Sequence, residues 1–207
     1  MSEFVISADV GKLTDYTAIV ILEKIPHMMR KFHSSTGHQY AGVEEYSRGL
    51  WFGDMYEVPS GEYDFNLIHI ERPSLGTTYP AIVNRLRELN DDYTALPGDK
   101  ELIVDTTGVG EPFFDMLKAA YFTHKLYGIT IHGGSEERRD GNKYYVPKRN
   151  LVSALSIANQ TGKLQIAENI PLADVFLQEV GNFQCRISDS VRISTKMKIR
   201  ICGKYGA

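Results

Sequence analysis

The chain has 207 residues, a formal net charge of -3, and 43% hydrophobic and 24% charged residues. This length supports one domain with a single core. No stretch reaches the ~20 apolar residues of a membrane span, and the N-terminus lacks the basic and apolar regions of a signal peptide, so we expect a cytoplasmic protein with no membrane partner. The slightly negative charge excludes a general attraction to nucleic acid, so any such contact needs a local basic patch.

Strands dominate the first part of the chain. Gly11 permits a tight turn between the first two apolar runs, so these runs predict a hairpin. The long polar and aromatic stretch that follows shows no sustained period. Strands are predicted over residues 4–8, 17–23, 40–51, 55–58 and 65–70.

Helices and strands alternate in the rest of the chain. Prolines mark predicted helix starts, and Thr161-Gly162 is a suitable end for the third helix. Helices are predicted to begin at or after Pro80, Pro112 and Pro147, with a fourth over 171–180. Strands are predicted over 102–105, 128–132, 164–166 and 183–187, and 144–146 as the returning arm of a hairpin whose charged loop covers 135–143. This order predicts an α/β fold, with a mixed β-sheet flanked by helices.

Two aspartates each follow an apolar strand. Asp9 comes after residues 4–8, and Asp105 after 102–104. If these strands are parallel neighbours, the two carboxylates face each other and repel unless they share a proton or a cation. Oxygen ligands suit Mg²⁺ or Mn²⁺, and metal-assisted phosphodiester chemistry is a common use of such sites. The sequence therefore predicts a divalent metal site at Asp9 and Asp105.

Every acidic candidate also has an ordinary structural explanation. Asp9 and Asp105 could each hydrogen-bond the backbone of a turn, although we favour metal binding for both. Asp15 is a further catalytic candidate that could equally begin the second strand. Asp189 is the last acidic residue that could reach the site as a metal ligand. Glu71 is expected to be structural, in an ion pair with the arginine that follows it.

Basic and aromatic residues alternate around the predicted hairpin. Lys143, Lys148 and Arg149 flank Tyr144 and Tyr145, and this combination favours a surface that binds the phosphates of a nucleic acid. The alternative is a solvated hairpin tip, because the preceding loop carries charges of both signs.

Several ordered blocks resemble the nuclease domain of the large terminase subunit of tailed bacteriophages, which has a ribonuclease H-like fold. These blocks are Asp9-Val10-Gly11…Asp15-Tyr16-Thr17-Ala18, and residues 75–80, 104–110, 145–155 and 177–183. The resemblance covers about residues 4–187 and implies a nuclease domain over 1–190. It implies a DNA endonuclease that hydrolyses phosphodiester bonds with two Mg²⁺ or Mn²⁺ ions. Asp9 would bridge the two ions, and Asp105 would hold one of them.

The same resemblance implies genome maturation in the cytoplasm of a host cell. Double-stranded DNA, portal proteins and small terminase proteins are the partners that it implies. An ATPase motor accompanies the nuclease in the family, but no Walker A motif occurs here, so we expect the motor to be absent from this chain.

The end of the chain departs from the family. Residues 191–207 are a basic, atypical tail without Asp, Glu or His, so the third carboxylate that the family supplies there is missing. The alternative function is therefore a catalytically impaired nuclease-like module that only binds DNA or packaging proteins. A sugar-kinase or actin-like ATPase is a third interpretation, disfavoured because this length holds no second matching half.

Overall fold

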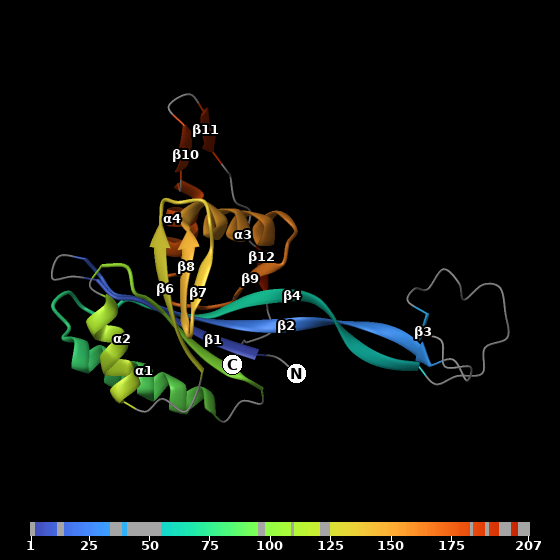
Figure 1. Ribbon diagram of the computed structural model, residues 1–207, viewed down its shortest axis with the longest axis horizontal. Coiled ribbons are helices and arrows are strands. Elements are labelled where there is room, and N and C mark those ends of the chain that lie inside the picture. Colours follow the sequence, from blue (N-terminus) through green and yellow to red (C-terminus); the bar gives the residue numbers. More distant parts are fainter. Residues whose placement is uncertain are drawn as a thin grey trace.

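The computed structural model describes residues 3–11, 15–33, 39–40, 55–94, 98–108, 110–120, 125–182, 184–188, 191–194 and 200–202 (Figure 1). These residues form an α/β structure in which helices flank a mixed β-sheet. The helices are α1 (Tyr79–Thr94), α2 (Gly110–Ala119), α3 (Lys148–Gln160) and α4 (Ala173–Asn182). Of the helices described, none is long and apolar enough to cross a membrane.

The strands follow one another through the chain as β1 (Glu3–Asp9), β2 (Ala18–His33), β3 (Gln39–Tyr40), β4 (Met55–Glu71), β5 (Lys100–Asp105), β6 (Lys125–His132), β7 (Arg138–Asp140), β8 (Lys143–Pro147), β9 (Leu164–Ala167), β10 (Gln184–Ser188), β11 (Val191–Ser194) and β12 (Arg200–Cys202). The main sheet has the order β12-β9-β4-β2-β1-β5-β6-β8-β7, with β3 paired to β2. Strands β10 and β11 pair separately.

The centre of the sheet combines antiparallel and parallel pairs. Strand β2 is antiparallel to both β1 and β4, so the predicted hairpin of the first two strands is confirmed. Strand β5 is parallel to β1, β6 to β5, and β8 to β6. The parallel arrangement brings the carboxyl ends of β1 and β5 to the same edge of the sheet.

Helices cover both faces of the sheet (Figure 1). The larger core lies between the central strands and the pair α1 and α2, and its most buried side chains include Ile19, Leu86, Leu102, Phe113 and Leu117. Fully burying one such side chain is worth about 1.5–3 kcal/mol. On the other face, a smaller cluster of Leu67, Ile70 and Ile166 packs against α4.

Strand β4 corrects the prediction of two separate strands over 55–58 and 65–70. It is continuous and pairs with an equally extended β2, so the two leave the sheet as a long ribbon (Figure 1). Pro59 and Gly61 favoured a break. In the ribbon, Pro59 pairs with Met28 next to a register shift, and proline is tolerated at such edge and bulge positions.

Strand β7 corrects the predicted hairpin. The antiparallel partner of β8 is β7, which lies within the loop predicted over 135–143, whereas β6 runs parallel to β8. All three residues of β7 are charged and exposed, so they lack the apolar alternation that signals a strand.

Two other predicted features lie partly outside the described residues. Residues 41–51 of the strand predicted over 40–51 lie outside them, as does Phe183 at the start of the strand that appears as β10. In the basic tail, β11 pairs with β10, and β12 pairs parallel with β9 at the edge of the main sheet.

Candidate functional site

Asp9 and Asp105 end two adjacent parallel strands. Their predecessors, Ala8 and Val104, are directly paired, and both are buried in the core that α1 and α2 cover. Because side chains alternate along a strand, Asp9 and Asp105 both lie on the opposite face. The arrangement on which the predicted metal site depended, parallel neighbouring strands, is confirmed.

The surroundings of Asp9 disfavour the ionised form of its carboxyl group. Loss of water around it, and then the negative charges of Asp105 and Asp15, raise the pKa of Asp9 above its ordinary value. The residue remains exposed, so a ligand can reach it from solvent. A cation bound beside Asp9 would offset this repulsion and favour the ionised carboxylate.

The turn between β1 and β2 places Asp15 in this group. The amide of Gly11 donates a hydrogen bond to Thr17 Oγ1 at 3.2 Å. A Cβ on Gly11 would lie 2.1 Å from the carbonyl oxygen of Asp15, so the turn closes only with glycine at this position. Thr17 thus supplies a hydrogen bond that stabilises the turn after Asp9.

Asp105 is oriented by its own backbone. The amide of Thr107 donates a hydrogen bond of 2.7 Å to Asp105 Oδ1. This is the turn hydrogen bond that the sequence left open as an alternative, and it engages one of the two carboxylate oxygens. Helix α2 begins at Gly110, whose backbone approaches that of Asp105 closely. A Cβ on Gly110 would lie 2.1 Å from the carbonyl oxygen of Asp105.

Asp9 and Asp105 supply carboxylate oxygens, the ligand type that hard divalent cations prefer. Mg²⁺ keeps several waters and is commonly bound through one or two carboxylates together with substrate phosphates. Within the described part of the chain, no group of three or more His, Cys, Asp or Glu side chains is arranged to hold a metal ion. Asp189, the proposed further ligand, lies outside that part.

A small pocket has Asp15 in its wall. Its volume is about 170 Å³, and five of its lining residues carry side-chain hydroxyls. The lining residues are Gly11, Asp15, Thr17, Ser74, Gly76, Thr77, Thr78 and Tyr79. The pocket therefore joins the β1–β2 turn to the start of α1.

The three basic candidates do not share one surface. Lys143 forms an ion pair with Glu111 of α2, at 2.5 Å, so it lies on the face opposite Asp9 and Asp105. The hydrogen bond from this ammonium group to Glu111 raises the pKa of Lys143. Lys148 and Arg149 are exposed at the start of α3, where Arg149 donates a hydrogen bond of 3.0 Å to the carbonyl of Ser135.

Sequence reasoning missed the arginines of β7. The guanidinium of Arg139 lies 5.0 Å from the ring centroid of Tyr144, and that of Arg138 lies 4.1 Å from the ring of Tyr145. These are two of the three directly paired positions of the β7–β8 hairpin. The signal was present in the sequence, because adjacent arginines and adjacent tyrosines flank the turn at Gly141.

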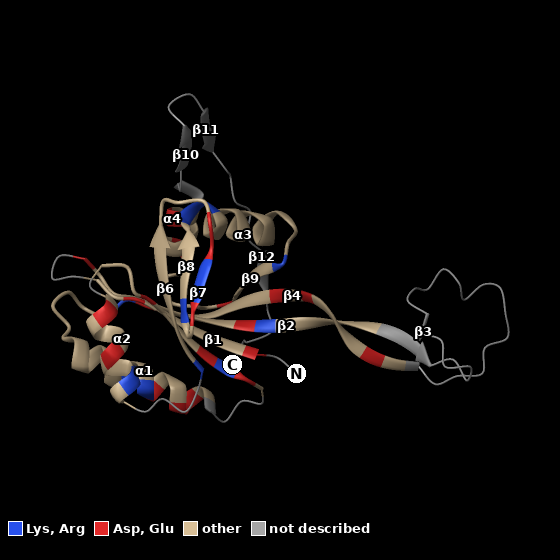
Figure 2. Cartoon of the chain, viewed as in Figure 1, with Lys and Arg blue, Asp and Glu red and all other residues tan. Residues whose placement is uncertain are grey.

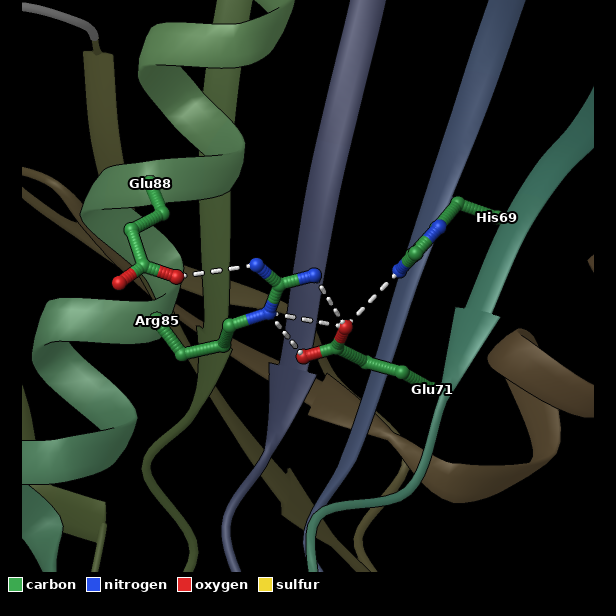
Figure 3. Close-up of polar contacts among 4 residues, drawn as sticks. All are labelled: His69, Glu71, Arg85 and Glu88. Carbon is green, nitrogen blue, oxygen red and sulfur yellow. Dashed lines mark hydrogen bonds and ion pairs between the residues drawn. The ribbon is translucent and has the colours of Figure 1, made fainter.

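Glu71 forms an ion pair, as expected, but its predicted partner is wrong. Its carboxylate accepts hydrogen bonds of 2.9–3.1 Å from Arg85 of α1 and lies 3.1 Å from His69 Nε2 (Figure 3). Arg72 instead pairs with Glu179 of α4, at 3.0 Å.

Comparison with known proteins finds no family model, curated protein or solved structure that matches the chain.

Proposed function

We propose that the protein is a metal-dependent DNA endonuclease with a ribonuclease H-like fold, of the kind found in the large terminase subunit of tailed bacteriophages. The observation that carries the proposal is the position of Asp9 and Asp105 at the ends of adjacent parallel strands, on one face of the sheet. The pKa of Asp9, which loss of water and then the charges of Asp105 and Asp15 raise, adds to it, because a cation would offset those like charges.

Asp9 and Asp105 would hold Mg²⁺ or Mn²⁺. When bound, such ions supply an activated water and offset the charge of the phosphate under attack. Thr107 orients Asp105 through its hydrogen bond, which leaves the second carboxylate oxygen for a ligand. Asp15 adds negative charge beside Asp9 and thereby strengthens the attraction for a cation.

The fold supports the proposed family. The antiparallel group β4–β2–β1 continues into the parallel group β1–β5–β6, which is a mixed sheet of the kind that the resemblance implies. Helices pack on both of its faces. The acidic residues lie where strand ends of an open α/β sheet commonly form a ligand site.

Double-stranded DNA is the proposed substrate, with portal and small terminase proteins as further partners. Lys148 and Arg149 are exposed cations that could contact its phosphates. Lys143 is less suited to this role, because Glu111 already neutralises its charge on the opposite face.

Nicking of supercoiled plasmid tests the proposal. We expect cutting by the wild-type protein in Mn²⁺ or Mg²⁺, none in EDTA, and a fall to background for Asp9→Asn. Asp115→Asn is the matched control, because this aspartate lies on α2 and pairs with Lys118 at the helix surface. It should cut like the wild type.

Absence of cutting by the folded wild-type protein in both metals would contradict an endonuclease. DNA binding without cutting would then favour the alternative, an impaired nuclease-like module. Equal cutting by Asp9→Asn and the wild type would instead show that the acid pair is not the active site.

A further inference from the structure

We propose that one face of β5, β6, β8 and β7 binds an unpaired strand of nucleic acid and leads it to Asp9 and Asp105. The surface is defined by Tyr127, Ile129, Tyr144 and Arg139, and we call it the tyrosine face. The role of this surface in guiding a strand to the acid pair rests on the proposed function. Its ability to bind the strand does not depend on cleavage.

The strand register places the tyrosine face in line with the acidic site. Asp105 pairs with Ile129, Ile129 with Tyr144, and Tyr144 with Arg139, each on the next strand across the sheet. With strands ~4.8 Å apart, the backbone of Tyr144 lies about 10 Å from that of Asp105. A bound strand crossing β8 and β6 would therefore reach Asp105 directly.

Contacts on the other face fix the direction of these side chains. Leu126 packs into the core beneath α2, and a Cβ on Gly128 would meet Phe114 of that helix. By alternation, Tyr127 and Ile129 lie on the side of Asp105. Lys143 forms an ion pair with Glu111 of α2, so it lies on the face that α2 covers. Tyr144, the next residue of the strand, therefore lies on the side of Asp105.

The tyrosine face is partly open to solvent. Tyr127, Ile129 and Tyr144 are each half-buried, and Arg139 is exposed. Neither hydrophobic cluster found among the described residues includes any of these side chains. The face therefore combines apolar, aromatic and cationic groups that the described core does not use.

The geometry of these groups is suited to stacking. The rings of Tyr127 and Tyr144 meet edge to face, with centroids 5.8 Å apart and planes at 72°. The guanidinium of Arg139 lies 5.0 Å from the Tyr144 ring, and its Nε donates a hydrogen bond of 2.9 Å to the carbonyl of Gly141. Of the described carboxylates, none forms an ion pair with Arg139, so its charge is available to a phosphate.

This chemistry favours an unpaired strand over a duplex. A duplex hides the planes of its bases within the stack, whereas an unpaired nucleotide presents both a base plane and a phosphate. Aromatic rings and guanidinium planes bind the base by stacking, and the cation binds the phosphate. Figure 2 shows the basic part of β7 beside β8, with β6 on the other side of β8.

The hairpin contains its own matched control. Arg138 and Tyr145 repeat the pair Arg139 and Tyr144 one residue away, with a guanidinium–ring distance of 4.1 Å. By alternation, they lie on the opposite face of the same two strands, away from Asp105. Substitutions in the two pairs therefore change the same chemistry on different faces.

Fluorescence anisotropy with fluorescein-labelled oligothymidylate in EDTA tests the proposal without cleavage. We expect the wild type to bind the single strand at least about tenfold more tightly than a duplex of equal length. Arg139→Gln and Tyr144→Leu should each weaken binding about tenfold, the scale of one lost stacking contact. Arg138→Gln and Tyr145→Leu should stay within about twofold of the wild type.

Three results would overturn the proposal: no binding of the single strand, equal or tighter binding of the duplex, or equal weakening by both pairs of variants. Arg139→Gln is decisive if Tyr144→Leu fails to fold, because Arg139 is exposed. Strand binding with the expected pattern, combined with no plasmid nicking, would disprove the endonuclease and leave this proposal standing.

Discussion

Asp9 is the residue at which partial loss of water and like charge act together. Removal of water and the charges of Asp105 and Asp15 all raise the pKa of its carboxyl. A pKa that is higher in the folded state than in the unfolded chain means that folding favours the protonated form. The stability gained by protonation is full below the unfolded pKa and is lost as pH rises through the folded pKa. At neutral pH without metal, the ionised Asp9 is therefore destabilising.

Asp9→Asn should raise the thermal stability of the metal-free protein near pH 7. The gain is expected to be at most a few degrees, because the side chain is exposed and about 1 kcal/mol shifts the Tm of a domain of this size by ~2–4 °C. The difference in Tm between variant and wild type should grow as pH rises above about 4, the region of an ordinary aspartate pKa. Calorimetry over this pH range would disprove the account if the difference were negative or constant.

The sequence pointed to individual residues more readily than to their partners. An aspartate after an apolar strand is a local pattern, so Asp9 and Asp105 could be singled out directly. Glu71 and Arg85 are 14 residues apart, and Glu111 and Lys143 are 32 apart. Such pairs form only when a helix packs on the sheet, so no local pattern predicts them.

At the scale of elements, α1 is joined to the sheet by a polar cluster as well as by its apolar face. Figure 3 shows Arg85 between Glu71 of β4 and Glu88 of the same helix. Burial alone would raise the pKa of Glu71, but the hydrogen bonds and charges of Arg85 and His69 outweigh it and lower that pKa. The stability that ionised Glu71 provides is therefore present above its unfolded pKa and lost as pH falls through the folded pKa.

Glu71→Gln should destabilise the protein by about 1.5–3 kcal/mol, the range for hydrogen bonds to charged groups. Glu88→Gln is the matched control and should cost less than about 1 kcal/mol, because that carboxylate is 63% exposed. Urea unfolding at pH 7 measures both values. The loss for Glu71→Gln should shrink as pH falls below about 4.5. Equal losses for the two variants would show that Glu71 does not fasten α1 to β4.

Elements with strong local signals were predicted well. Helices α1, α2 and α3 begin within two residues of a proline, the signal that predicted their starts. Strand β7 has only charged, exposed residues, and it is held by pairing with β8 and by cation–ring contacts across the hairpin. The length of β4 depends on β2 as its partner, so the chain around Pro59 and Gly61 could not reveal it.

At the scale of the whole molecule, the two faces of the sheet differ. One face packs on α1 and α2 and holds the larger core. The other packs on α4 near β4 and β9 and carries the acid pair and the tyrosine face nearer β5, β6 and β8. The α/β class followed from the order of elements, whereas the adjacency of the two acidic strands was only a condition of the predicted site and was established by the strand pairing. The strand register was needed to assign each side chain of the β7–β8 hairpin to one face of the sheet or the other.

The central claim is that Asp9 and Asp105 form one cation site. Calorimetric titration of Mn²⁺ into the wild type, Asp9→Asn, Asp105→Asn and the double variant tests it most directly. Residues that share one ligand are coupled, so their effects do not add. We predict that each single variant loses most of the Mn²⁺ affinity and that the double variant loses little more. Wild-type affinity in both single variants, with their folding confirmed, would contradict the claim.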